Sequence, residues 1–235
     1  MKKTIGILGG MGPMATADLF QKITALTDAA RDSDHIRVYI DSNASIPDRT
    51  AAILEGGEDP APAMADALKN LELCGADCAV MPCNTAHYFL PRLEPLAKIP
   101  FLSMIEAAAK ACRLRYPGKM AAILATAGTL AAGLYQDALA AEGVQFLVPE
   151  PEEREALMAV IYQGVKAGAP PERYRAAFLS VTEGMTRRGA ECFLLACTEL
   201  PVAVQELGLR LPCVDPTEEL AKAAIRFCGY RVRGE

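Results

Sequence analysis

Short apolar runs alternate with amphipathic stretches along nearly the whole chain. The apolar runs have the length of β-strands, and the stretches between them carry apolar residues at the spacing of one helix face. The predicted strands are residues 5–8, 37–40, 78–81, 101–103, 120–124, 145–148, 192–195 and 213–214. The predicted helices are residues 17–29, 62–73, 152–166 and 173–188. Strands that alternate with helices predict an α/β fold built on parallel sheets.

The second half of the chain repeats the first. Residues 75–83 (GADCAVMPC) match residues 189–197 (GAECFLLAC), with both cysteines in register. Residues 120–130 have the same form as residues 4–14: an apolar run, a loop of small residues and a helical segment. Matched blocks in the same order indicate two homologous halves. We therefore expect two pseudo-symmetric lobes, each a mostly parallel four-stranded sheet flanked by helices, with the active site in the interlobe cleft.

Composition and charge limit the classes of partner. The chain has 235 residues, a net charge of −5 and no basic run. Nucleic acid and membrane surfaces are therefore poor partners, and no run of about 18 apolar residues predicts a membrane span. Eight cysteines are present, but disulfide scaffolds are usually much smaller than this chain. We expect reduced thiols and a cytoplasmic protein.

The opening segment has features of an export signal, because Lys2 and Lys3 precede an apolar run and residues 15–17 (ATA) imitate a cleavage site. Several glycines and Pro13 interrupt that apolar run. An export signal also has no reason to recur at residues 120–130. The segment is therefore expected to belong to the folded protein.

The same segment satisfies the dinucleotide-binding pattern G-x-G-x-x-[GA] from Gly10 through Gly12 to Ala15. Asp41 ends the predicted second strand, where a ribose-binding acid belongs. An NAD-dependent dehydrogenase is thus one alternative. Pro13 is unusual in such a phosphate loop, and a dehydrogenase leaves the matched cysteines unexplained.

Two of the cysteines follow equivalent strands. Ligands of open parallel sheets bind beyond the carboxyl ends of the strands, which is where Cys83 and Cys197 are expected. A thiolate and a thiol on opposite sides of one carbon can remove a proton from one face and return a proton to the other. Most cysteines are simply buried, and Cys78 and Cys192, inside apolar strands, fit that structural role.

Zinc bound by Cys83, His87 and Cys197 is a second possibility for thiols near a histidine. The second half contributes no histidine at the matching position, and the usual Cys-x-x-Cys pair is absent. A redox pair lacks the same motif. We therefore expect neither a metal nor a redox function.

Four motifs in order resemble the aspartate/glutamate racemase family over nearly the whole chain. They are residues 9–13 (GGMGP), 46–50 (IPDRT), 82–87 (PCNTAH) and 197–199 (CTE). The resemblance implies racemization of an amino acid without a cofactor, by two thiols, on a two-lobed fold that forms a homodimer. It also implies that the last helix returns to the first lobe, so that residues 1–99 with 212–235 form one lobe and residues 100–211 the other.

Carried over by position, the resemblance assigns roles to individual residues. Cys83 and Cys197 are the two acid/base residues. The predicted substrate-binding residues are Met11 in the opening loop, Arg49, Asn84, Thr85, Thr126, Lys166 and Thr198. One departure is Ala196, where the family usually has glycine before the second cysteine, and we expect the extra methyl group to be tolerated.

An acidic substrate needs a cation for its side-chain carboxylate, and the fork of Arg49 can bind it with two hydrogen bonds. Asp48 or Ser45 is expected to cap the following helix, which puts Arg49 in a first turn where the helix dipole disfavours a cation. Lys166 either faces the substrate, as the resemblance implies, or is a surface lysine at a helix end.

Two further residues have roles that the sequence leaves open. His87 either tunes the thiol of Cys83 or satisfies a buried hydrogen bond. Glu199 either orients the thiol of Cys197 or caps the next segment. A non-catalytic two-lobed protein that binds small acids is the remaining alternative. The sequence does not separate aspartate from glutamate or from a broader range of amino acids.

Overall fold

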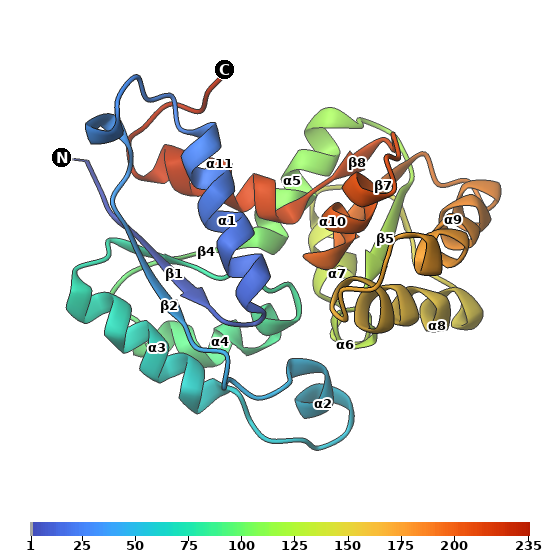
Figure 1. Ribbon diagram of the computed structural model, residues 1–235, viewed down its shortest axis with the longest axis horizontal. Helices are drawn as coiled ribbons and strands as arrows, with labels where there is room; N and C mark the ends of the chain where they lie inside the picture. Colours follow the sequence, from blue (N-terminus) through green and yellow to red (C-terminus); the bar gives the residue numbers. More distant parts are fainter. Residues whose placement is uncertain (1) are drawn as a thin grey trace. The chain divides into compact units, whose positions relative to one another are not determined.

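A computed structural model of the protein describes residues 2–235. The chain forms two compact units: Met1–Ala107 with Thr217–Glu235, and Ala108–Pro216. Each unit contains a four-stranded parallel sheet, with strand order β2-β1-β3-β4 in the first and β6-β5-β7-β8 in the second. Helices flank both sheets (Figure 1). The identical strand order confirms the α/β class and the duplication predicted from the sequence.

The first unit begins with a strand and returns to its sheet three times. Its strands are β1 (Ile5–Gly9), β2 (Val38–Ser42), β3 (Cys78–Val80) and β4 (Phe101–Leu102). Its α-helices are α1 (Pro13–Leu26), α2 (Arg49–Leu54), α3 (Ala61–Cys74) and α4 (Leu90–Leu93), and its 3-10 turns are η1 (Asp32–Asp34), η2 (Thr85–Phe89) and η3 (Glu94–Leu96). Helix α5 (Met104–Arg115) leads from this unit into the second.

Strand β1 runs through the middle of the first sheet and is buried along its whole length. Successive side chains of a strand point to opposite faces, and Leu8, Ala79 and Met81 pack with α3 and α4 in one core cluster. Cys83 belongs to this same cluster. Packing of α3 and α4 against that face therefore fixes the position of the first predicted catalytic residue.

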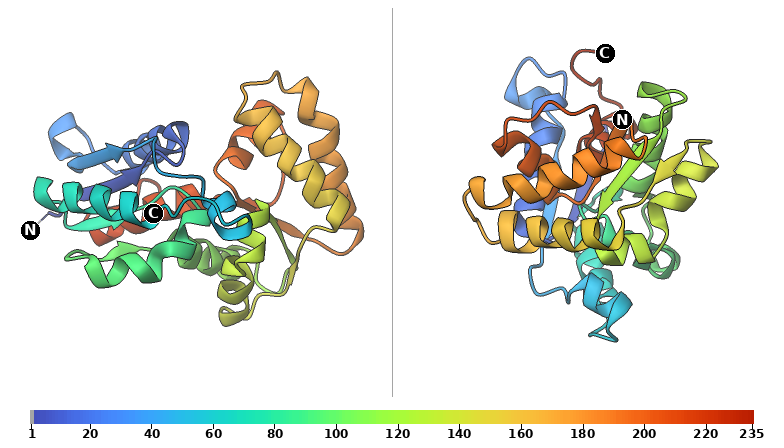
Figure 2. Two further views of the ribbon diagram at one scale, coloured as in Figure 1. Left: turned by 90° about the horizontal axis from the view of Figure 1, so that it is seen from below. Right: turned by 90° about the vertical axis from the view of Figure 1, so that its right-hand side faces the viewer.

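The second unit repeats this plan. Its strands are β5 (Ala121–Ala125), β6 (Phe146–Leu147), β7 (Cys192–Ala196) and β8 (Cys213–Val214). Its helices are α6 (Ala127–Ala131), α7 (Leu134–Ala141), α8 (Pro151–Ala159), the π-helical segment η4 (Val160–Val165), α9 (Glu172–Arg187) and α10 (Glu199–Glu206). Helices α8 and α9 pack side by side (Figure 2). Phe193, Leu195 and Cys197 join a core cluster with these helices.

The last helix, α11 (Pro216–Phe227), belongs almost entirely to the first unit. After it, the backbone N–H of Lys3 donates to the carbonyl of Cys228, and Thr27 forms an antiparallel bridge with Val232. The expected lobe boundaries at residues 99 and 211 lie before β4 and β8. These strands pair with β3 and β7, so each stays with its own sheet and the observed boundaries fall later.

Two predicted helices differ from the observed ones for physical reasons. The helix predicted at residues 17–29 begins at Pro13, because a proline is well suited to the first helical position, and it ends at Leu26. The regular helix predicted at residues 152–166 changes to π-helix at Val160. A periodic pattern of apolar residues is too coarse to reveal one additional residue in a single turn. Within residues 2–235, no helix is both long and apolar enough to span a bilayer.

Candidate active site

Cys83 follows β3 at the carboxyl end of the first sheet. Its backbone N–H donates to the carbonyl of Met81 at 2.9 Å, which turns the chain directly after the strand. The residue is 7% exposed, and the neighbouring Asn84 and Thr85, predicted to bind substrate, are also buried. The structure therefore gathers three predicted site residues where the chain passes from β3 into η2.

His87 supports the backbone beside Cys83. Its Nδ1 lies 2.9 Å from the carbonyl oxygen of Cys83, and its Nε2 accepts the backbone N–H of Met104 at 3.2 Å. A nitrogen that accepts must be unprotonated, so Nδ1 is the donor. Burial lowers the pKa of His87 to about 4. Of the two predicted roles, the structure supports the buried hydrogen bond.

The same geometry counts against zinc bound by His87. Both ring nitrogens of this histidine already bond the backbone, so neither is left to ligate a metal. In the part of the chain that the structure describes, no three His, Cys, Asp or Glu side chains gather as metal ligands.

Arg49 is the first residue of α2, and Asp48 caps this helix by accepting the N–H of Ala51 at 2.8 Å. The predicted capping by Asp48 is therefore confirmed. The Nη1 of Arg49 donates to the carbonyls of Ile46 and Pro47, and its Nη2 donates to the carbonyl of Met11 at 3.4 Å. The guanidinium group thus joins the opening loop to the segment before α2.

Two observations place this group at the edge of the core around Cys83. Met11, Ile46 and Cys83 share one buried cluster. The Nε of Arg49 is buried and has no hydrogen-bond partner among residues 2–235. A buried donor without a partner is costly, so an acceptor that reached this atom would stabilise it.

The opening loop packs closely against the segment after β2. Gly10 has a φ of +91°, and a Cβ on it would lie 2.2 Å from the carbonyl carbon of Asn43. Its N–H donates to Oγ1 of Thr16 in α1. Asp41, the candidate ribose-binding acid, accepts a hydrogen bond from the amide of Asn70 at 2.8 Å. Packing therefore explains why position 10 is a glycine, and the hydrogen bond from Asn70 explains the carboxylate of Asp41.

In the second unit, Thr126 and Cys197 follow neighbouring strands. Ala125 at the end of β5 pairs with Ala196 at the end of β7, so the residues after them lie at the same sheet edge. Thr126 caps α6, its Oγ1 accepting the N–H of Thr129. Ala196, the departure from the family pattern, is fully buried within the sheet.

The thiol of Cys197 has a carboxylate partner. Its Sγ donates to Oε2 of Glu199 at 2.9 Å, and Oγ1 of Thr198 donates to the same oxygen at 3.1 Å. Lys166 places its Nζ 3.8 Å from Oε1 of Glu199. Burial first, and then the Glu199 carboxylate, hold the pKa of Cys197 well above its usual value, while Lys166 acts in the opposite direction. The Glu199 carboxylate is thus the hydrogen-bond acceptor of the second thiol.

Two tyrosines near this group were not predicted from the sequence. The Nζ of Lys166 lies 4.4 Å above the ring of Tyr162, a cation–π contact whose four-residue spacing was a detectable signal. Tyr135 is fully buried, and burial raises its pKa, with smaller contributions from Cys112, Asp215 and Cys197. No local motif indicates Tyr135, because its neighbours come from distant segments.

Other cysteines have structural surroundings. None of the eight, all of which lie within residues 2–235, forms a disulfide. Cys78 and Cys228 are fully buried, and their mutual hydrogen bond, followed by burial, raises the pKa of Cys78. Burial also raises the pKa of Cys192 to about 11. Cys78 and Cys192 therefore stay protonated near neutral pH, as expected for structural residues.

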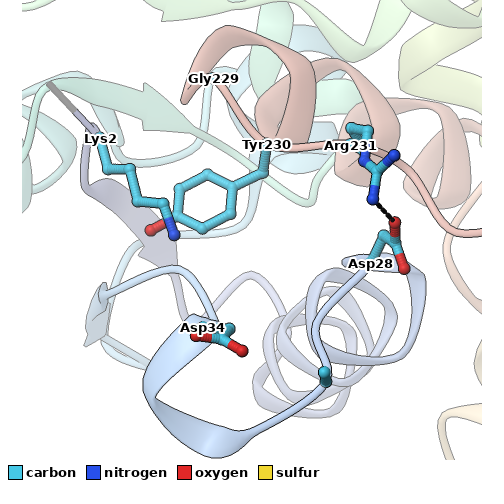
Figure 3. A pocket seen from close by; sticks show the side chains of 7 residues that line it. Lys2, Asp28, Asp34, Gly229, Tyr230 and Arg231 are labelled. Atoms are coloured by element: carbon cyan, nitrogen blue, oxygen red, sulfur yellow. Dashed lines mark ion pairs between the residues drawn. The ribbon is translucent and has the colours of Figure 1, made fainter.

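A cavity of about 390 Å³ lies near the chain ends in the first unit. Figure 3 shows Lys2 beside Tyr230, and an ion pair between Asp28 and Arg231. Asp34 adds another carboxylate to its wall. None of the predicted site residues lines this cavity, and its cationic and anionic side chains largely balance one another.

The chain is similar to known proteins over nearly its whole length. The family model described as Asp/Glu/hydantoin racemase matches residues 8–224. The chain is 26% identical over 227 residues to the broad specificity amino-acid racemase RacX of Bacillus subtilis, covering 94% of this chain and 96% of that protein. The structure of Picrophilus torridus aspartate racemase is 33% identical with a TM-score of 0.82, covering 98% of this chain and 96% of that one.

An aspartate racemase homologue from Pyrococcus horikoshii has a similar structure. It is 25% identical with a TM-score of 0.77, and the match covers 97% of this chain and 99% of that one. The family match, together with the two sheets of identical order, explains the repeated Cys motif better than a dehydrogenase does. The protein belongs to the aspartate/glutamate/hydantoin racemase family.

Proposed function

We propose that this racemase-family enzyme interconverts the L and D forms of an acidic amino acid, aspartate or glutamate, without a cofactor. One observation carries the proposal: two sheets of equivalent strand order each have a buried thiol within three residues of the end of the third strand of their half. Cys83 and Cys197 are the proposed acid/base pair. The mechanism requires them to reach opposite faces of one substrate α-carbon.

In one direction, the thiolate of Cys83 removes the α-proton, so that an S–H bond forms as the C–H bond breaks. The electron pair left on the α-carbon takes the proton of the Cys197 thiol from the opposite face. Cys197 is then a thiolate and Cys83 a thiol, and proton exchange with solvent restores the starting state. The reverse reaction uses the same two groups with their roles exchanged.

Two cationic side chains, those of Arg49 and Lys166, support the choice of an acidic substrate. Arg49 has a buried, unpartnered Nε, which a substrate carboxylate can accept from. Lys166 lies beside Glu199 in the second unit. We assign Asn84, Thr85, Thr126 and Thr198 to the substrate's α-carboxylate and amine, with Met11 forming part of the binding loop. The similarity to an aspartate racemase favours this class, and the similarity to a broad specificity racemase makes a wider range worth testing.

The proposal also includes a homodimer in the cytoplasm. The homodimer rests on the resemblance to the family, and size-exclusion chromatography with light scattering tests it. The cytoplasmic location is supported by the chemistry, since both thiols must remain reduced to exchange protons.

The substrate is identified by proton NMR of the enzyme in D2O with a panel of L-amino acids, without added cofactor or metal. We expect aspartate or glutamate to lose the α-proton signal while the D-enantiomer appears. Lack of exchange across the panel, with folded protein and reduced thiols, would refute racemization. Ligand binding that persists without turnover would then indicate a binding protein, and binding of NAD(H) a dehydrogenase.

The two bases are tested by Cys83→Ser and Cys197→Ser. Each variant should lose nearly all inversion while its circular dichroism spectrum stays that of the wild type. The matched control is Cys213→Ser, which replaces a partly exposed thiol of β8 that is not part of the proposed pair. Near-normal racemization by either single variant at the proposed pair would rule out the two-thiol mechanism.

A further inference from the structure

Glu199 connects three groups inside the second unit. Its Oε2 accepts hydrogen bonds from the thiol of Cys197 and the hydroxyl of Thr198, and its Oε1 faces Nζ of Lys166. The Glu199 side chain is only 13% exposed. A carboxylate this sheltered needs hydrogen bonds and a counter-charge, and these three neighbours supply them.

The π-helical segment brings Lys166 to this group. The N–H of Lys166 bonds the carbonyl of Ile161, five residues earlier, at 2.9 Å. Each additional residue turns a helix by about 100°, so this one wide turn changes the direction in which Lys166 points. Segment η4 packs against α10, which begins with Glu199. The π-helical turn thus leads directly into the residue that contacts Glu199, Lys166.

We propose that Glu199 is a positioning residue for Cys197, keeping its thiol protonated and oriented as the proton donor, with Lys166 limiting the strength of this effect. The inference rests on the proposed function and extends it. An S–H donor is stabilised by a carboxylate acceptor, whereas a thiolate 2.9 Å from that carboxylate is repelled by it. The charged and titratable groups that face Cys197 are Glu199, Lys166 and Tyr135.

The two halves of the site are then chemically different. Cys197 is held as the proton donor, so in the proposed reaction Cys83 is the group that removes the α-proton. When Cys197 donates its proton, the electron pair of the broken S–H bond remains on sulfur, and Lys166 is the nearby cation that offsets the new negative charge. A purely structural Glu199 would not link thiol reactivity to these charges.

The test is alkylation of Cys197 by iodoacetamide across a pH series, without substrate, with labelling of each cysteine read by peptide mass spectrometry. Only the thiolate reacts appreciably. For Glu199→Gln, the pH of half-maximal Cys197 labelling should fall by about 1 unit or more, the size of a single neighbouring charge effect. For Lys166→Met it should rise. Labelling of Cys83 in the same samples is the internal reference, and its pH of half-maximal labelling should be the same in the wild type and in both variants.

Glu206→Gln is the matched control, because it removes a carboxylate from the other end of α10, where Glu206 accepts from the hydroxyl of Tyr174. Its Cys197 profile should equal that of the wild type. A Glu199→Gln profile that is unchanged or moves to higher pH would overturn the proposal. If Glu199→Gln does not fold, the proposal would be overturned by a Lys166→Met variant in which the pH of half-maximal Cys197 labelling does not rise. Since no turnover is measured, the result is independent of whether the panel of amino acids reveals racemization.

Discussion

Acidification should destabilise the fold through His87. Burial lowers the pKa of this side chain from 6.5 to about 4. Each pKa unit corresponds to about 1.4 kcal/mol, so protonating His87 in the folded state costs about 3 kcal/mol. Because the unfolded chain binds the proton more readily, the contribution is fully present above pH 6.5 and is lost as the pH falls towards about 4. Between about pH 7 and pH 5 the loss is roughly 2 kcal/mol.

The matched variant is His87→Gln, whose amide provides one donor for the carbonyl of Cys83 and one acceptor for the N–H of Met104 but does not titrate. Urea unfolding of both proteins at the two pH values gives the difference in their free energies of unfolding, in which other titrating groups cancel. We expect the wild type to lose roughly 2 kcal/mol relative to the variant on acidification. A difference that stays constant, or a Cε1–H NMR signal of His87 that titrates near 6.5, would refute the reasoning.

Two further predictions concern the loops around the first thiol. Gly10→Ala should lower the free energy of unfolding by about 2 kcal/mol or more, because its Cβ would collide with Asn43, whereas Gly12→Ala has open space and should change it by less than about 0.5 kcal/mol. Thermal unfolding measures both, and equal losses would contradict the packing argument. Asp48→Ala should remove about 1 kcal/mol of capping from α2. Hydrogen exchange at the amide of Ala51 should become faster, and unchanged protection would contradict it.

Much of the architecture was predictable because it repeats. Alternating apolar runs located all eight strands to within a few residues, and the duplicated Cys motif placed Cys83 and Cys197 after equivalent strands. Helices α5, α7 and α10 were not assigned from the apolar pattern. Tertiary packing decides such segments more than local propensity does.

The contacts of the site were less predictable because they join distant residues. The second partner of His87 is the N–H of Met104, 17 residues further along the chain. Lys166 reaches Glu199 from the end of a π-helical turn, which has no reliable sequence signal. For Glu199, two residues after Cys197, the sequence left orienting and capping roles equally open, and the side-chain geometry supports the first.

The central claim is that two bases act on opposite faces of one carbon, and the most direct measurement follows the α-hydrogen of L-aspartate or L-glutamate in D2O during the first few per cent of reaction. A two-base enzyme places solvent deuterium on the D-product while the remaining L-substrate keeps its α-proton. We therefore expect deuterated D-product and protonated L-substrate. Deuterium entering the L-substrate faster than the D-product forms, or α-protium retained in the D-product, would indicate a single base and contradict the account.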